Sequence, residues 1–125
     1  MIDKKFYKCS ACGNIIGFIL DGGGTLTCCN KPMDILTANS TDAATEKHVP
    51  VVTRTGNKLE VHVGSVAHPM EEKHSIQWIC VSQGPKTQRI ALSPGQEPKS
   101  VFDIESGPAV VFEYCNLHGL WKADC

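Results

Sequence analysis

Four cysteines near the N-terminus constrain the fold of this chain most, because they lie in a segment with few large apolar side chains. Cys9-Ser10-Ala11-Cys12-Gly13 is a Cys-x-x-Cys turn in which Gly13 can adopt a positive φ, and Cys28-Cys29 follows after fifteen intervening residues. A segment of roughly thirty residues cannot build a sufficient core unaided, so a metal or disulfides must supply the missing stability. We therefore expect a small first domain over residues 1–36, organised around these cysteines.

A metal explains these cysteines better than disulfides do. The chain of 125 residues has seven cysteines, an odd number, and its start, Met1–Phe6, has no apolar core typical of a signal peptide. Clustered cysteines in a reducing cytosol more often bind metal, with two loop disulfides as the alternative. Cys28 and Cys29 point apart in an extended segment, so both can be ligands only across a bend. We predict a cytoplasmic protein with a structural or redox tetrathiolate site.

Composition excludes two classes of partner. The formal net charge is −1, which favours neither nucleic acid nor an anionic membrane surface. No apolar run approaches the roughly 20 residues that span a bilayer. The sequence therefore predicts no nucleic-acid partner and no membrane segment.

Residues 37–125 are dominated by short apolar or β-branched runs separated by turns, and no window supports a helix of ten residues. The expected strands are 49–55, 59–63, 75–82, 86–92, 101–104 and 109–115, with a short closing segment around 120–122. Such spacing is typical of an antiparallel β-sandwich of immunoglobulin-like type. The chain is therefore predicted to be mostly β, with a small metal-knuckle domain followed by this sandwich.

The alternation of side chains separates candidate ligands from other residues. His62 lies on the polar face of the expected strand 59–63, so a solvated side chain is its expected role. Alternation also predicts Ile76, Trp78 and Cys80 on one face of a later strand, with Cys80 in the core. Cys125 is expected to be a frayed terminal thiol.

A second group of possible metal donors lies near strand ends. Cys115-Asn116-Leu117-His118 follows an apolar run, and His48, His68 and His74 also stand in turn-like contexts. Each could instead be a surface histidine or a buried structural cysteine. A sandwich gathers its loops at two ends, so donors that are distant in sequence can meet there.

The donor types narrow the identity of the metal. Four imidazoles and one thiolate exceed the four ligands of tetrahedral zinc, and a blue-copper site expects a methionine after the last histidine. Residues 119–125 contain no methionine, which leaves iron favoured and copper second. The competing functions are a copper-binding, cupredoxin-like electron carrier, a dismutase, and a non-catalytic β-sandwich binding module with a zinc knuckle.

The motifs resemble a known family. Cys9-x2-Cys12-x15-Cys28-Cys29 is similar to the desulforedoxin module. Three further motifs resemble the catalytic domain of superoxide reductase: Glu46-Lys47-His48, His68-Pro69-Met70-Glu71-Glu72-Lys73-His74 and Cys115-Asn116-Leu117-His118. Together they resemble desulfoferrodoxin, the two-iron form, over essentially the whole chain, with domains at 1–36 and 37–125.

The resemblance implies two iron ions per chain and one activity. One iron would be bound by Cys9, Cys12, Cys28 and Cys29, a ligand set that also accepts zinc. The second would have four equatorial imidazoles and an axial thiolate, contributed by His48, His68, His74, His118 and Cys115. The implied activity is one-electron reduction of superoxide to hydrogen peroxide without oxygen release, in a homodimer that receives electrons from a rubredoxin-like donor.

Formal charge distinguishes the two expected sites. Ferrous iron with four thiolates totals −2 and is coordinatively closed, whereas ferrous iron with four neutral imidazoles and one thiolate totals +1 and is open. An anionic substrate is therefore expected at the second site. Lys47 would add positive charge beside His48, with an ordinary solvated lysine as the alternative. Glu46 would close the sixth position of ferric iron, as the resemblance implies; otherwise it is a surface carboxylate.

Overall fold

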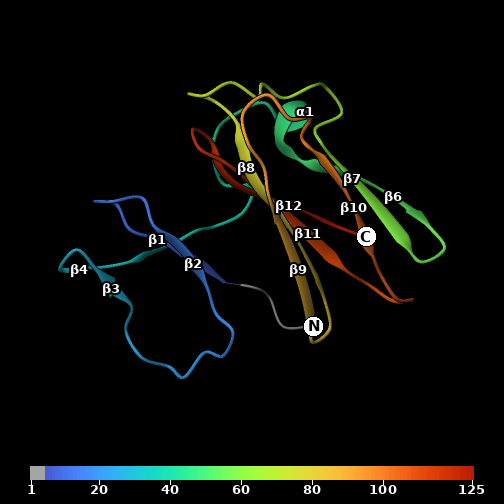
Figure 1. Ribbon diagram of the computed structural model, residues 1–125. Coiled ribbons are helices and arrows are strands. Elements are labelled where there is room, and N and C mark those ends of the chain that lie inside the picture. Colours follow the sequence, from blue (N-terminus) through green and yellow to red (C-terminus); the bar gives the residue numbers. More distant parts are fainter. Residues whose placement is uncertain (1–4) are drawn as a thin grey trace. The chain divides into compact units, whose positions relative to one another are not determined.

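The structure is a computed structural model that describes residues 5–125. The first four residues, part of the stretch on which the signal-peptide expectation rests, lie outside the described residues. The chain divides into two compact units, with the boundary between Thr37 and Ala38 (Figure 1). Within the described part of the chain, no helix is long and apolar enough to cross a membrane.

The first unit consists of very short strands. One sheet has the order β2-β1-β5, and a separate hairpin pairs β3 with β4. The strands are β1 (Phe6–Lys8), β2 (Ile15–Gly17), β3 (Thr27–Cys28), β4 (Lys31–Pro32) and β5 (Asp34–Ile35). Among residues 5–37 only Phe6 and Cys9 are buried, so this unit has almost no apolar core of its own.

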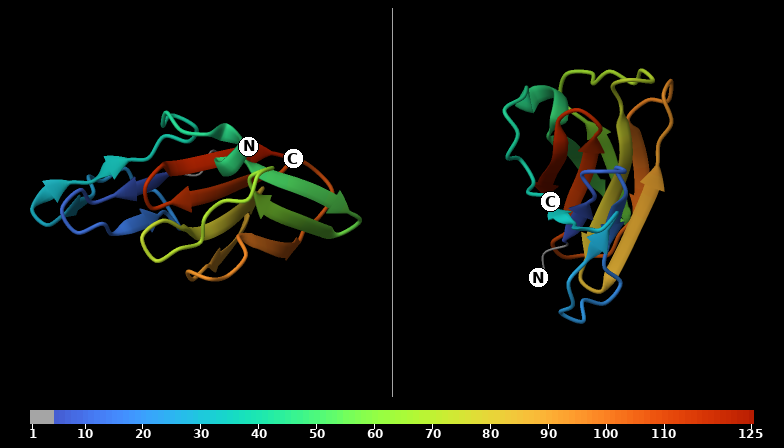
Figure 2. Two further views of the ribbon diagram at one scale, coloured as in Figure 1. Left: turned by 90° about the horizontal axis from the view of Figure 1, so that it is seen from above. Right: turned by 90° about the vertical axis from the view of Figure 1, so that its left-hand side faces the viewer.

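The second unit is a sandwich of two antiparallel sheets. One sheet has the order β10-β7-β6 and the other β12-β11-β8-β9; Figure 2 shows the green hairpin β6–β7 and the red hairpin β11–β12 from two further sides. The elements are α1 (Thr45–His48), β6 (Pro50–Thr55), β7 (Lys58–Val63), β8 (Ile76–Gln83), β9 (Lys86–Ala91), β10 (Lys99–Asp103), β11 (Val110–Cys115) and β12 (Gly119–Asp124). The predicted class, mostly β with a sandwich after a cysteine knuckle, is confirmed.

The sandwich core is formed by apolar side chains from both sheets. On β7, Leu59, Val61 and Val63 are buried, while Glu60 and His62 between them are exposed, as the alternation predicted. On β11, which lies between β12 and β8, all six residues are buried, so both faces of this strand are covered. The core therefore reaches along β11 to Cys115 at its end.

One sequence expectation about β8 is wrong. Tyr114 pairs with Trp78, but the next residue, Cys115, pairs with Ile76, so Gln77 is an extra residue in β8. Such a bulge reverses the alternation on its far side. Ile76 therefore packs in the core, whereas Trp78 stacks on Tyr114 on the other face of the sheet. Cys80 pairs with Phe112 on that other face; it is buried as expected, but outside the core between the sheets.

Cys125 also differs from the expectation of a frayed end. Its backbone N–H donates to the carbonyl of Ala109 and its carbonyl accepts from the N–H of Ala109, at 2.9 and 3.0 Å. The side chain is partly buried against the core. The β11–β12 pairing thus extends beyond β12 and holds the C-terminal residue in place.

A carboxyl group lies in this apolar interior. Glu113 of β11 is fully buried, and neither carboxyl oxygen has a hydrogen-bond partner among residues 5–125. Burial raises the pKa of the Glu113 carboxyl well above its usual range. As pH rises past the ordinary carboxyl pKa, the unfolded chain releases this proton before the folded chain does, so stability falls.

We therefore expect Glu113→Gln to stabilise the metal-loaded protein at pH 8, by about 1–3 kcal/mol. The gain should shrink at pH 5, because that pH lies close to the ordinary pKa of the carboxyl in the unfolded chain, so that keeping the buried group protonated costs little there. Urea unfolding midpoints of both proteins at the two pH values measure this. An equal loss of stability at both pH values would show that Glu113 has a partner that Gln cannot replace.

Candidate metal centres

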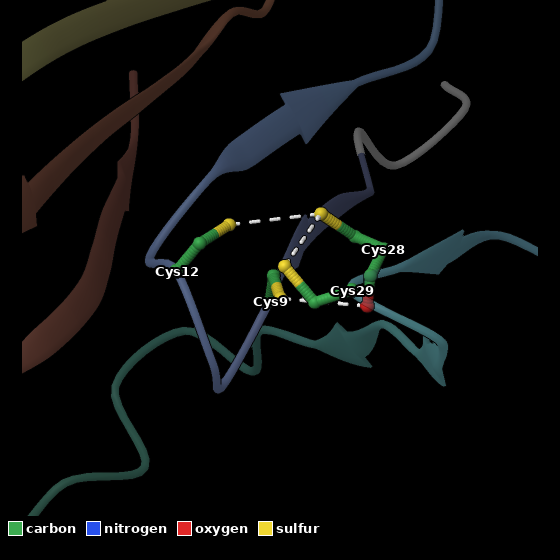
Figure 3. A group of neighbouring side chains, drawn as sticks. All are labelled: Cys9, Cys12, Cys28 and Cys29. Carbon is green, nitrogen blue, oxygen red and sulfur yellow. Dashed lines mark hydrogen bonds between the residues drawn. The ribbon is translucent and has the colours of Figure 1, made fainter.

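The four N-terminal cysteines converge on one point in the first unit (Figure 3). Their sulfur atoms all lie within 4.8 Å of one another. Cys12 Sγ is 3.6 Å from Cys28 Sγ, which is 3.9 Å from Cys29 Sγ. The bend that the adjacent pair requires is a two-residue hairpin turn, with φ of 54° at Cys29 and 61° at Asn30. Gly13 has the expected positive φ of 82°.

These distances fit a metal and not a disulfide. All four cysteines are free thiols, and a sulfur–sulfur bond would be about 2.05 Å long. Sulfurs that share a tetrahedral ion at about 2.3 Å lie about 3.8 Å apart. Backbone N–H groups of Cys12 and Ala11 lower the pKa of Cys9 to about 6, whereas the thiol of Cys12 and its neighbours raise the pKa of Cys29 to about 12. Four crowded sulfurs cannot all ionise without a cation, and the donor set suits iron or zinc.

The second cluster forms where loops meet at one end of the sandwich. His48 ends α1, and His68 and His74 lie in the connection between β7 and β8. Cys115 ends β11, and His118 stands in the turn before β12. The donor atoms of His48, His68, His74 and Cys115 lie within 4.8 Å of one another. The Nδ1 atom of His118 is 3.8 Å from Cys115 Sγ and 3.1 Å from His48 Nε2.

Two of these imidazoles have one ring nitrogen fixed by the backbone. His48 Nδ1 lies 2.7 Å from the carbonyl oxygen of Ala44, and His68 Nδ1 lies 2.7 Å from that of Pro69. A carbonyl only accepts, so each Nδ1 carries the proton and each Nε2 presents a lone pair. Burial lowers the pKa of both rings, to about 4 for His68, which keeps them neutral.

The remaining ring nitrogens then require a cation. The Nε2 atoms of His48 and His68 are both acceptors, yet they lie 3.1 Å apart with no proton to share. His74 Nε2 is buried and has no partner among the described residues. Cys115 is fully buried, and burial raises the pKa of its thiol. Converging lone pairs and a buried thiol fit a bound metal ion, which neutralises the repulsion and favours the thiolate.

Trp121 on β12 contacts two of these histidines. Its ring stacks on His48, with centroids 5.0 Å apart, and its Nε1 donates to the carbonyl of His118 at 3.1 Å. Sequence reasoning placed Trp121 only in a closing strand. Its position depends on the pairing of β11 with β12, which no residue type in the sequence signals.

The other predicted residues fall into two groups. His62 is exposed and hydrogen-bonds Glu60 at 2.7 Å, away from the cluster, as expected. Glu46 and Lys47 are exposed on α1, immediately before the buried His48. The backbone of α1 is tied to the following loop, because the Glu46 carbonyl accepts from Val66 N at 2.9 Å and from Ser65 Oγ at 3.3 Å.

Comparison with known proteins gives consistent results over both units. The family model described as "Desulfoferrodoxin, N-terminal domain" matches residues 3–36, and "Desulfoferrodoxin" matches residues 40–124. A desulfoferrodoxin of Syntrophotalea carbinolica is 54% identical over 120 residues, covering 96% of this chain and 95% of that protein. A desulfoferrodoxin of Desulfarculus baarsii is 51% identical over 120 residues, with the same coverage.

The similarity extends to solved structures. The crystal structure of the superoxide reductase from Treponema pallidum matches with a TM-score of 0.78 and 30% identity, covering 98% of this chain and 99% of that one. The family models together span both the cysteine cluster and the histidine–cysteine cluster. The chain therefore belongs to the desulfoferrodoxin family.

Proposed function

We propose that this protein is a superoxide reductase that converts superoxide to hydrogen peroxide by one-electron reduction, without releasing oxygen. The observation that carries this proposal is the buried cluster of four imidazoles and one thiol whose donor atoms converge. Membership of the desulfoferrodoxin family and likeness to superoxide reductase structures support it. The reaction takes up one electron and two protons for each superoxide.

The residues divide into two proposed sites. The first is held by Cys9, Cys12, Cys28 and Cys29 in a domain over residues 1–36, and it binds iron, or zinc in its place. The second, in a domain over residues 37–125, is held by His48, His68, His74, Cys115 and His118. An iron ion held by these residues would supply the one-electron chemistry, and the Cys115 thiolate would favour its oxidation.

The chain's own residues determine what reaches the second site. His48, His68 and Cys115 are buried, which excludes bulk water from one side of the cluster. Lys47, exposed and adjacent to His48, attracts the superoxide anion and offers N–H donors to it. Glu46, exposed beside Lys47, would close the sixth position of a ferric ion, as the family resemblance implies.

Three further properties belong to the proposal. The donor is a rubredoxin-like electron carrier, and the chain forms a homodimer, as the family resemblance implies. The protein works in the cytoplasm, a location that its free cysteines support. The tetrathiolate centre either relays electrons or only stabilises its unit.

Mixing the anaerobically reduced protein with a known amount of superoxide tests the reaction directly. We expect about one hydrogen peroxide and one oxidised iron per superoxide, with no oxygen evolved beyond the spontaneous background. Protein loaded with redox-inert zinc at the histidine–cysteine site controls for that background. Half an equivalent of oxygen per superoxide would make the protein a dismutase, and the role of the electron donor would then be abandoned.

Lys47→Ala is expected to slow superoxide capture about tenfold at low ionic strength while both metals stay bound. The reason is that the substitution removes a positive charge beside His48. Pulse radiolysis over a range of salt concentrations measures the effect, and capture by the wild type should depend on salt more steeply. Lys86→Ala, which removes an equal charge from the exposed far end of β8–β9, is the control and should leave capture unchanged. Capture by Lys47→Ala equal to wild type would refute the steering role.

Gly64 determines how closely the next loop approaches α1. Its φ is +82°, and a Cβ there would lie 2.6 Å from the carbonyl oxygen of Lys47 and 2.7 Å from that of Val66. The Gly64 N–H also donates to the Val49 carbonyl at 3.2 Å. Any side chain would therefore push α1 and its Lys47 backbone away from this loop.

Gly64→Ala is thus expected to slow superoxide capture several-fold and to destabilise the protein by more than the strain of a left-handed alanine, about 1–3 kcal/mol. Gly56→Ala isolates that strain, because Gly56 has a φ of +57° with no atom within 4 Å of the added Cβ. Thermal midpoints and capture rates of the two variants give the comparison. Equal effects of both substitutions would mean that the contact with Lys47 is unimportant.

A further inference from the structure

Asn116 connects the Cys115–His118 turn to the segment that carries His74. Its Oδ1 accepts from the Ser75 N–H at 3.0 Å, and its Nδ2 donates to the Lys73 carbonyl at 2.9 Å. Its backbone N–H also donates to the Ser75 carbonyl at 3.2 Å. The hydrogen bonds therefore reach both sequence neighbours of His74.

These bonds lie directly beyond the β-bulge of β8. Cys115 pairs with Ile76 because Gln77 is skipped, and the Asn116–Ser75 bond continues that shifted register by one residue. In an unbulged ladder Cys115 would face Gln77, and Asn116 would face Ile76 instead of Ser75. Without the bulge, the pairing with β11 would therefore shift by one residue along β8, and the position of His74 relative to Cys115 would change.

Ser75 and Ile76 anchor the segment after His74 by burial, but the residues before it lack such an anchor. Glu71, Glu72 and Lys73 are exposed, so burial contributes little there. On its other side His74 exchanges two backbone hydrogen bonds with Glu71, which close a small loop. That loop has its own shape, but Asn116 ties it to the strand that carries Cys115.

We propose that Asn116 is a positioning residue that fixes the bulged register of β8 against β11, and thereby sets the position of His74 relative to Cys115 and His118. It contacts neither the donor atoms nor a substrate. The inference rests on the proposed ligand set. Its consequence is that the side chain of Asn116 controls the ligand arrangement around the second metal without belonging to it.

Three variants of the full-length, iron-loaded protein test this role. Asn116→Ala removes both side-chain bonds, whereas Asn116→Asp keeps the acceptor for Ser75 and loses the donor to Lys73. Gln83→Ala is the matched control, since the Gln83 amide likewise bonds the backbone of Glu105 and Gly107, at the opposite end of β8. The readouts are the thiolate-to-iron charge-transfer absorption after oxidation, deuterium uptake by backbone amides, iron content and superoxide capture.

For Asn116→Ala we expect a shifted absorption maximum and deuterium uptake at residues 73–76 that is faster by about three- to tenfold. Superoxide capture should fall several-fold. In Asn116→Asp the Ser75 amide should remain protected from deuterium exchange. Its absorption maximum should lie between those of Asn116→Ala and wild type. Gln83→Ala should speed uptake only near Glu105 and leave absorption and capture unchanged. Loss of iron from the second site in Asn116→Ala alone, with β7 amides still protected, would also support the proposal.

Absorption and uptake at 73–76 that match wild type in Asn116→Ala would overturn the proposal. So would equal absorption shifts in Asn116→Ala and Gln83→Ala, because the effect would then be general destabilisation. If Asn116→Ala does not fold, unchanged absorption in Asn116→Asp overturns it. Oxygen release by the wild type would instead refute the proposed function, while the absorption and uptake comparison would still decide the role of Asn116.

Discussion

The repulsion between donor lone pairs that converge at one end of the sandwich is the constraint on which the second unit depends. His48 and His68 face each other with acceptor nitrogens 3.1 Å apart, and carbonyl oxygens hold their other nitrogens so that neither ring can turn away. Such an arrangement is unfavourable until a cation occupies it, so the free energy of metal binding becomes part of the free energy of folding. The apolar core of the sandwich must hold the ligands in this repulsive arrangement before the ion arrives.

The two metal centres therefore differ in their dependence on the fold: the first stabilises its unit, and the second is held in place by its unit. Residues 5–37 bury only Phe6 and Cys9, so the tetrathiolate site supplies cohesion that the segment lacks. Residues 38–125 have a core extending from Leu59 on β7 to Cys115 on β11, and there the fold supplies the rigidity of the site. Loss of metal should therefore unfold the first unit, whereas in the second unit it should mainly disorder the ligands.

Much of this arrangement was accessible from the sequence, because donor type and context are local properties. Histidines next to turns could be separated from His62 by the alternation of one strand, and the gathering of loops at a sandwich end explains why the separated donors meet. The register with which β8 pairs with β11 could not be predicted from the sequence. The extra residue Gln77 in β8 leaves no signature in residue types, so Trp78 and Cys80 were wrongly assigned to the core face that Ile76 occupies. Contacts made by Asn116, Trp121 and Cys125 depend on that long-range pairing and could not be anticipated either.

The charge of the chain indicates where attraction of a small anion must arise. A net charge of −1 gives the protein no overall attraction for superoxide, and salt screens interactions beyond about 8–10 Å under physiological conditions. A lysine can therefore act only if it lies close to the open side of the metal. Lys47 is next in sequence to the buried His48, and the loop through Gly64 is hydrogen-bonded to the backbone on either side of this pair, at Glu46 and Val49. If Lys47 has its proposed role, local placement of one cation would replace a long-range field, and the geometry of α1 would matter more for substrate capture than the total charge of the surface.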